Sequence, residues 1–160
     1  MRRAISTILC VPLLCSLAMG QTGSPTQKVI TSTTLEDFQK HVQSLGFDCS
    51  RGKDDKGKDD TYFIFRAEGY KVAAFVPSPN IIELDNVFTD VHPSLADLNE
   101  WNRNNSLSRV YIDASGDVVL QNEIQISGGV TSETLNLFIT SFRDSVVKWA
   151  RFVLDKEGKK

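Results

Sequence analysis

The chain has 160 residues, a formal net charge of −2 and 41% hydrophobic residues, which is enough for one domain with a sizeable core. Positive and negative residues are interspersed, so the sequence offers neither a basic stripe for nucleic acid nor a polybasic face for anionic lipid. We therefore predict no nucleic-acid partner.

The first 20 residues have the pattern of a secretory signal peptide. Arg2 and Arg3 give a basic start, residues 8–17 are an apolar run, and Ala18-Met19-Gly20 is a small-residue cleavage site. The run has about ten residues, whereas a membrane-spanning helix needs about 20. We expect cleavage after Gly20, a periplasmic or secreted product and no membrane insertion afterwards.

Cysteine use changes when the signal peptide is removed. The remaining 140 residues have a net charge of −4, because Arg2 and Arg3 are the only charged residues lost. Cys10 and Cys15 leave as well, so Cys49 is alone and no internal disulfide can form. A buried free thiol and an intermolecular bridge remain alternatives for Cys49, and its place in a predicted strand favours the thiol.

The segment after the signal peptide divides into a leader, a domain and a tail. Residues 21–32 are polar, contain Pro25 and lack apolar periodicity, so we predict a disordered leader. We place the domain at residues 33–156 and a flexible tail at residues 157–160.

One amphipathic helix and four strands are predicted in the first half of the domain. Thr33 or Thr34 can cap the helix and Gly46 favours its end. Its apolar face consists of Leu35, Phe38, Val42 and Leu45. The period then changes from helical to alternating, which predicts strands at Phe47–Ser50, Thr61–Ala67, Lys71–Val76 and Ile81–Asn86.

Residues 51–60 contain glycines and carboxylates, so a calcium loop and a solvated hairpin tip are alternatives for this segment. The ligand order of an EF-hand is missing, which favours the hairpin tip. No His or Cys residues have the spacing of metal ligands either, so we predict no metal site.

A helix, a hairpin and a long helix are predicted in the second half. Ser94 can cap the first helix, and the hairpin joins Ser108–Asp113 to Val118–Ile126. Thr131 or Ser132 can cap the final helix. Its apolar residues repeat at steps of three and four: Leu135, Phe138, Ile139, Phe142, Val146, Trp149 and Val153.

The predicted order is α-β-β-β-β-α-β-β-α. Runs of strands with few helices are typical of an α+β domain, in which the helices cover one face of an antiparallel sheet. We therefore predict that fold class.

Two motifs carry a resemblance to a known family. Trp101-Asn102 ends a predicted helix before the strand Arg109-Val110-Tyr111-Ile112-Asp113, and Gly128-Gly129-Val130-Thr131 precedes the final helix. This order resembles the YbjN family, whose strand reads Arg-Val-Tyr-Leu-Asp, over roughly residues 33–155. The resemblance implies a fold similar to type III secretion chaperones, a sensory-transduction regulator and, by analogy with that fold, a homodimer.

Trp101 and Asn102 are candidate binding residues because they match the family motif. We interpret Trp101 as a core residue, since it continues the apolar stripe of its helix. Asn102 can satisfy free backbone carbonyls or lock the following strand. Gly128 and Gly129 are candidates for presenting amides to an anion, although a simple tight turn is favoured because no phosphate-loop lysine follows.

Arg109, Tyr111 and Asp113 alternate along one predicted strand and should project from the same face. They can form a recognition row for a partner peptide or a polar ligand. The structural alternative pairs Arg109 and Asp113 with neighbouring residues around a half-buried Tyr111.

The sequence contains no catalytic motif, so we predict neither catalytic residues nor a cofactor. His92 lies near Asp90 and Ser94, but capping of a helix explains the Asp and the Ser. Our leading hypothesis is an exported, non-enzymatic module that binds another polypeptide. A small-ligand sensor or hydrolase using Arg109, Tyr111 and Asp113 is the alternative, and a structural envelope protein is a third.

Overall fold

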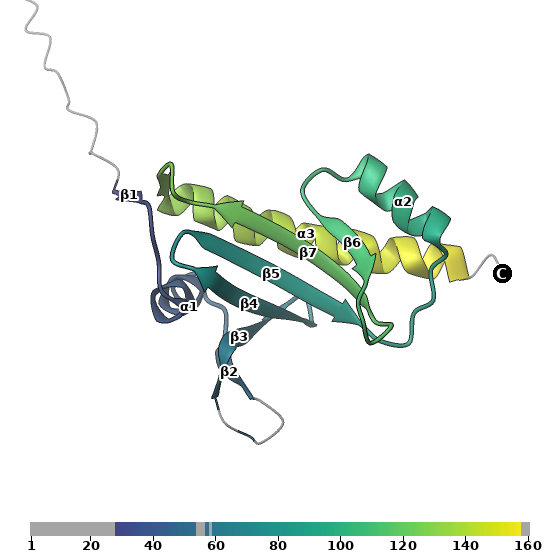
Figure 1. Ribbon diagram of the computed structural model, residues 1–160, viewed down its shortest axis with the longest axis horizontal. Helices are drawn as coiled ribbons and strands as arrows, with labels where there is room; N and C mark the ends of the chain where they lie inside the picture. The colour runs from purple at the N-terminus through teal and green to yellow at the C-terminus, as the bar shows by residue number, and fades with distance from the viewer. Residues whose placement is uncertain (1–27, 54–56, 58, 158–160) are drawn as a thin grey trace, which may run out of the picture.

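The computed structural model describes residues 28–53, 57 and 59–157, and it contains three helices and eight strands in that range (Figure 1). The helices are α1 (Leu35–Ser44), α2 (Leu95–Asn104) and α3 (Ser132–Glu157). The strands are β1 (Val29–Ile30), β2 (Cys49–Lys53), β3 (Asp59–Ala67), β4 (Tyr70–Ser78), β5 (Ile81–Phe88), β6 (Arg109–Ile112), β7 (Val118–Gln125) and β8 (Val130–Thr131).

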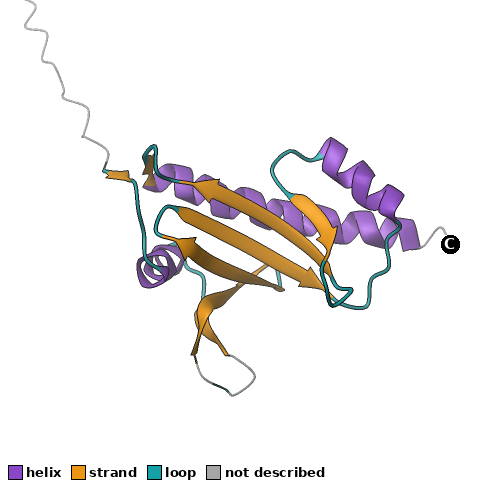
Figure 2. Ribbon diagram, viewed as in Figure 1, coloured by secondary structure: helices purple, strands orange, loops and turns teal. Residues whose placement is uncertain are grey.

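Six strands form one sheet in the order β2-β3-β4-β5-β7-β6, and all neighbours are antiparallel. Figure 2 shows α3 behind this sheet, with no helix crossing in front of β5 and β7. The predicted α+β class, the antiparallel sheet and the order of its elements are confirmed.

The helices α1 and α3 cover the same face of the sheet. Phe38 of α1 packs against Phe63 of β3, with ring centroids 5.7 Å apart, and Trp149 of α3 packs against Phe88 of β5 at 6.4 Å. Cross-strand pairing places Phe63 and Phe88 on the same side, because side chains alternate along each strand. The prediction that helices lie on one face is therefore confirmed.

The final helix is the longest element, with 26 residues. All seven residues of its predicted apolar stripe are at most 7% exposed. Thr131 caps it as predicted, because its hydroxyl accepts a hydrogen bond from the backbone N of Thr134 at 3.2 Å. Among the residues that the structure describes, no helix has both the length and the apolarity needed to cross a membrane.

The predicted leader needs a correction at its end. Val29 pairs with Thr131 and Ile30 with Val130, and these pairs form a separate two-stranded sheet. Pairing satisfies backbone groups of both strands, and Ile30 also packs against the core, so this part of the leader is ordered. The predicted signal peptide, residues 21–27 and residues 158–160 lie outside the described residues.

Several strand boundaries also differ from prediction. The strand β2 runs from Cys49 to Lys53, and β3 begins at Asp59, so both extend into the segment predicted as a hairpin tip. The strand β4 was predicted to end at Val76, but it continues through Pro77, which has no N–H to donate, to Ser78. The pairing of β4 with β5 shifts between Phe75 and Ser78, and such an irregularity tolerates proline.

Candidate functional site

Trp101 lies in the core, as its place in the apolar stripe predicted. It is 3% exposed, and its ring packs edge-on against Trp149 and Phe152 of α3 at centroid distances of 5.2 and 5.8 Å. An ion pair of 2.6 Å between Lys156 and Glu100 adds a second connection between α3 and α2. Trp101 therefore holds α2 on α3 and presents no surface to a ligand.

Asn102 locks the strand that follows its helix. Its Nδ2 donates to the carbonyl oxygen of Val110 at 2.9 Å, and its Oδ1 accepts from the backbone N of Val110 at 2.8 Å. Because β6 is the last strand of the sheet, the side chain occupies backbone groups with which another strand could pair. Strand locking is therefore the role that the structure gives Asn102.

Arg109 and Tyr111 meet Gln121 on the sheet face that α1 and α3 leave uncovered, which we call the open face. The Nε of Arg109 donates to Oε1 of Gln121 at 2.7 Å, and Nη2 donates to the same oxygen. The guanidinium carbon lies 5.8 Å from the centroid of the Tyr111 ring, and the Tyr111 hydroxyl accepts from Nε2 of Gln121 at 3.4 Å. Gln121, only 4% exposed, joins the two predicted residues.

Asp113 does not continue this row, because β6 ends at Ile112. Its Oδ1 accepts hydrogen bonds from the backbone N atoms of Ser115 and Asp117, both at 2.9 Å. These bonds close the turn between β6 and β7, which is typical of an aspartate at a turn. The expected row of three therefore reduces to Arg109 and Tyr111.

Three carboxylates that the sequence analysis did not single out lie beside this pair on the open face. Glu83 and Asp85 belong to β5, and Glu123 belongs to β7. Glu83 is directly opposite Glu123, and Asp85 is directly opposite Gln121. The alternation along β5 assigns Glu83 and Asp85 to one face, but only the pairing of β5 with β7 brings Glu123 to them.

Burial perturbs two of these carboxylates. Burial raises the pKa of Asp85 to about 6. A hydrogen bond from Gln121 lowers this pKa, the charge of Glu83 raises it, and the charge of Arg109 lowers it. Burial also raises the pKa of Glu83, and repulsion from the charge of Glu123 raises it further. Oδ1 of Asp85 is buried and has no hydrogen-bond partner among the described residues. The group therefore favours the protonated state more than an exposed aspartate does.

A recess of about 340 Å³ opens where β6 begins. Its lining includes Asn102, Arg109, Gln121 and Glu123, but neither Tyr111 nor Asp113. The recess thus collects amide, guanidinium and carboxylate groups, which suit a small polar ligand better than an apolar one.

Gly128 and Gly129 form the turn between β7 and β8. Gly129 has a φ of +90°, a conformation that favours glycine, and its N donates to the carbonyl oxygen of Ile126 at 2.9 Å. A side chain at Gly129 would collide with Val29 of β1. The tight-turn alternative accounts for this pair of glycines without an anion.

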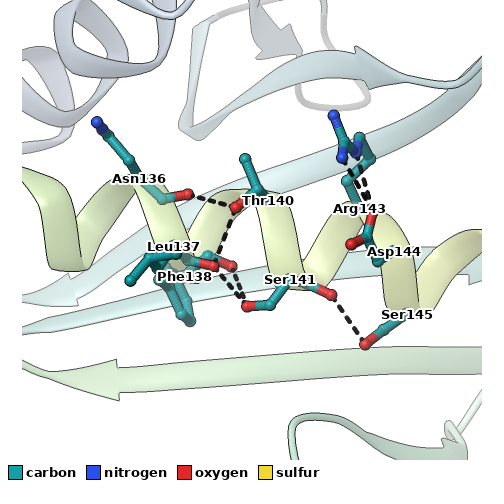
Figure 3. Close-up of polar contacts among 8 residues, drawn as sticks. All are labelled: Asn136, Leu137, Phe138, Thr140, Ser141, Arg143, Asp144 and Ser145. Atoms are coloured by element: carbon teal, nitrogen blue, oxygen red, sulfur yellow. Dashed lines mark hydrogen bonds and ion pairs between the residues drawn. The ribbon is translucent and has the colours of Figure 1, made fainter.

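Three hydroxyl groups in the middle of α3, those of Thr140, Ser141 and Ser145, are bonded within the helix. Figure 3 shows that these three hydroxyls donate to carbonyl oxygens of their own helix. Thr140 bonds to Asn136 at 2.9 Å, Ser141 to Leu137 at 2.6 Å, and Ser145 to the carbonyl of Ser141 at 3.0 Å. In these bonds each hydroxyl donates its proton to a backbone carbonyl and not to a general base that could activate it as a nucleophile.

Ser94 has the capping role predicted for it. Its hydroxyl accepts from the backbone N of Asp97 at 3.2 Å, and the Asp97 carboxylate accepts from the backbone N of Ser94 at 3.0 Å. This capping box explains Ser94 without chemistry. Its carboxylate comes from Asp97 and not from Asp90, whose own carboxylate accepts from the Thr89 hydroxyl at 3.3 Å. Across the described ranges, no three His, Cys, Asp or Glu side chains are grouped to hold a metal ion.

Cys49 is half-buried and unbridged, and it packs against the core. Its Sγ lies 3.7 Å from the carbonyl oxygen of Phe47. Burial, with a smaller contribution from Asp48, raises the pKa of the Cys49 thiol to about 11. The thiol is therefore protonated at neutral pH, which disfavours attack on another sulfur.

The fold is similar to that of a solved secretion chaperone. The chain is similar to the type III secretion chaperone SycH of Yersinia pestis, whose crystal structure is of a complex with a stable fragment of YscM2. The TM-score is 0.50 and the sequence identity 14%, over 72% of this chain and 98% of that chain. At this identity the likeness shows a common fold.

The family follows from the sequence match. The model of the YbjN family, described as "Putative bacterial sensory transduction regulator", matches residues 34–155. This match covers more than half of the chain, so the chain belongs to the YbjN family. No curated protein sequence matches the chain.

Proposed function

We propose that this YbjN-family protein is a non-enzymatic module that binds another polypeptide, in a chaperone-like or regulatory role. The observation that carries the proposal is the open face. The helices α1 and α3 do not cover this face, although it contains apolar side chains. Tyr62, Ile64 and Phe75 are only partly buried there, and Val87 is 49% exposed. Partly exposed apolar side chains beside charged ones are typical of protein interaction surfaces.

The comparisons support this proposal. The structure of SycH contains a polypeptide fragment, which gives one precedent for a bound polypeptide on this fold. The family description names signal regulation, which also works through recognition of partners.

The place of action is a separate part of the proposal. The basic start, apolar run and cleavage site of residues 1–20 support export, so we propose that the domain binds its partner in the periplasm or after secretion. Fractionation of cells that produce the full chain tests this directly. A cytoplasmic product of uncut mass would contradict export without affecting the binding proposal.

Affinity capture with a tagged full-length chain tests polypeptide binding. We expect a stoichiometric protein partner in native mass spectrometry, and we expect Phe75→Ala on the open face to remove it. Leu137→Ala is the matched control, because Leu137 is 65% exposed on α3 and lies outside the open face. Equal recovery with all three proteins, or a bare domain in each case, would contradict the proposal.

A small-ligand sensor remains the second candidate function, because the 340 Å³ recess contains Arg109 beside Asn102. The proposal for this recess is binding of a small polar molecule. Native mass spectrometry of the purified chain should then reveal a bound small molecule that Arg109→Ala releases. A small molecule that stays bound in the Arg109→Ala variant, or no bound molecule in the unaltered chain, would contradict the sensor function.

A further inference from the structure

The open face carries a straight row that changes from aromatic to acidic. Tyr62 of β3 is opposite Phe75 of β4, Phe75 is opposite Glu83 of β5, and Glu83 is opposite Glu123 of β7. We call these four residues the aromatic–acidic row. Neighbouring strands are about 4.8 Å apart, so the row is about 14 Å long.

The aromatic end of the row is a packed platform. The rings of Tyr62 and Phe75 have centroids 5.2 Å apart. Gly52 of β2 allows Tyr62 to lie against the neighbouring strand, since a Cβ at Gly52 would collide with the Tyr62 ring. The platform is therefore held in place before any partner arrives.

The acidic end is electrostatically unfavourable on its own. Like charges directly opposite each other destabilise an antiparallel pair, and Glu83 and Glu123 are in that arrangement. Asp85, two residues along β5, adds a third carboxylate on the same face. Arg109, whose charge acts on Glu83 and Asp85, donates hydrogen bonds from Nε and Nη2 to the neutral amide of Gln121.

Other cations of the open face lie away from the row. Arg66 and Lys71 are opposite each other on β3 and β4. The row next to the aromatic–acidic row contains Ile64, Ala73 and Asp85. Arg66 and Lys71 lie one row beyond it, two residues from Ile64 and Ala73 on their strands. The face is thus divided into an acidic part on β5 and β7 and a basic corner on β3 and β4.

We propose that the aromatic–acidic row binds an extended segment of a partner protein in which a Lys or Arg residue is followed, or preceded, by apolar residues two and four positions away. This inference rests on the proposed function and names the chemistry of its partner. The basic side chain lies between Glu83 and Glu123, and the two apolar side chains lie on Phe75 and Tyr62.

The spacing follows from strand geometry. Alternate residues of an extended chain project to the same side and are about 6.6 Å apart, so the first and fifth residues are about 13 Å apart. That length matches the row from its acidic end to Tyr62. The positive charge complements the opposed carboxylates and removes the repulsion between them, which increases the gain on binding.

A defined peptide tests the inference on the full-length chain. The probe is Lys-Thr-Leu-Thr-Phe with blocked ends, and the comparisons are Glu-Thr-Leu-Thr-Phe and the re-spaced Lys-Leu-Thr-Phe-Thr. Dissociation constants are measured by NMR titration. We expect the probe to bind at least about tenfold more tightly than the acidic peptide, because its ammonium group lies between two opposed carboxylates that repel the glutamate of the acidic peptide.

Variants locate the effect. Glu83→Gln with Glu123→Gln should abolish the preference for lysine while the weak apolar binding remains. Glu36→Gln with Asp144→Asn is the matched control, because it removes two exposed carboxylates from the helices with the same change of net charge. The control should keep the preference.

The outcomes separate this inference from the proposed function. Equal binding of the lysine and glutamate peptides, with a polypeptide partner still captured through Phe75, overturns the basic segment and keeps the polypeptide-binding function. A lysine preference that persists in the Glu83 and Glu123 double variant overturns the location. Absence of peptide binding together with absence of a captured partner overturns both.

Discussion

The two faces of the six-stranded sheet are built from the same strands but meet different demands. On the covered face, Phe63, Ala74, Leu84 and Leu120 are all 0% exposed. On the open face, the next residues along the same strands include Tyr62, Phe75, Glu83 and Gln121, which combine aromatic, acidic and amide groups.

The covered face thus stabilises the fold, whereas the open face presents side chains for binding. Each fully buried Phe or Leu side chain of the covered face contributes about 1.5–3 kcal/mol to folding. The open face contains an opposed pair of glutamates and a buried carboxylate oxygen of Asp85 without a partner, which both reduce stability. Local violations of the rules for stable sheets are concentrated at functional surfaces, which agrees with a binding role for the open face.

The largest expected effect is on the covered side. Trp101→Ala should lower the free energy of unfolding by about 3–5 kcal/mol, because it removes a buried ring from the contact with Trp149 and Phe152. Urea denaturation measures the loss. Leu107→Ala is the control, since Leu107 is 60% exposed. Similar losses in both variants would mean that our assignment of the core is wrong.

The strand lock should have an intermediate effect. Asn102→Ala should cost about 1–3 kcal/mol, because the backbone N and O of Val110 lose their partner. The amide of Val110 should also exchange hydrogen faster than in the unaltered chain. Asn104→Ala, at the exposed end of the same helix, should change neither quantity. Unchanged exchange at Val110 in the Asn102 variant would contradict the lock.

The open face should respond in the opposite direction. The pKa of Asp85 in the folded protein, about 6, is above its ordinary value of 3.8, so folding favours the protonated carboxyl. Its contribution to stability is complete below pH 3.8 and is lost as the pH rises through about 6. We therefore expect Asp85→Asn to be more stable than the unaltered chain at pH 7 and to show a smaller decline over that window.

Denaturation at a series of pH values measures the difference, with Asp144→Asn as a control on exposed α3. Parallel curves for the Asp85 variant and the unaltered chain would show that Asp85 is not the perturbed group. A less stable variant at pH 7 would mean that its charge stabilises the fold.

Cys49 should show the smallest effect, because it lies at the edge of the core. Since burial raises the pKa of its thiol to about 11, alkylation at pH 8 should be slower in the folded chain than in the chain unfolded in urea. Non-reducing electrophoresis should show no covalent dimer. Rapid labelling of the folded chain or a disulfide-linked dimer would instead support the intermolecular bridge.

The main elements could be predicted because their periodicities are local and long. The final helix is one example: its seven apolar residues recur for about five turns at helical spacing, and the structure buries all of them. The pairing of β1 with β8 could not be predicted, because two residues are too few to show a period. Its partners, Ile30 and Val130, are 100 positions apart in the chain.

The candidate site was predictable only in part, for a related reason. Alternation placed Arg109 and Tyr111 on one face of their strand, but it does not state which strand lies beside which. Glu83 and Glu123 become neighbours because β7 returns beside β5 after α2 and β6. Asp113 was misplaced because the strand ends one residue earlier, where its carboxylate closes a turn.

Site-specific photo-cross-linking tests the binding role of the open face most directly. A photoreactive amino acid replaces Val87 on the open face or Leu137 on the solvent side of α3, two exposed apolar positions. Irradiation of cells that produce the full-length chain should join a protein partner to position 87 and not to position 137. Cross-links from position 137 alone, or equal cross-links from both, would contradict a binding site on the open face.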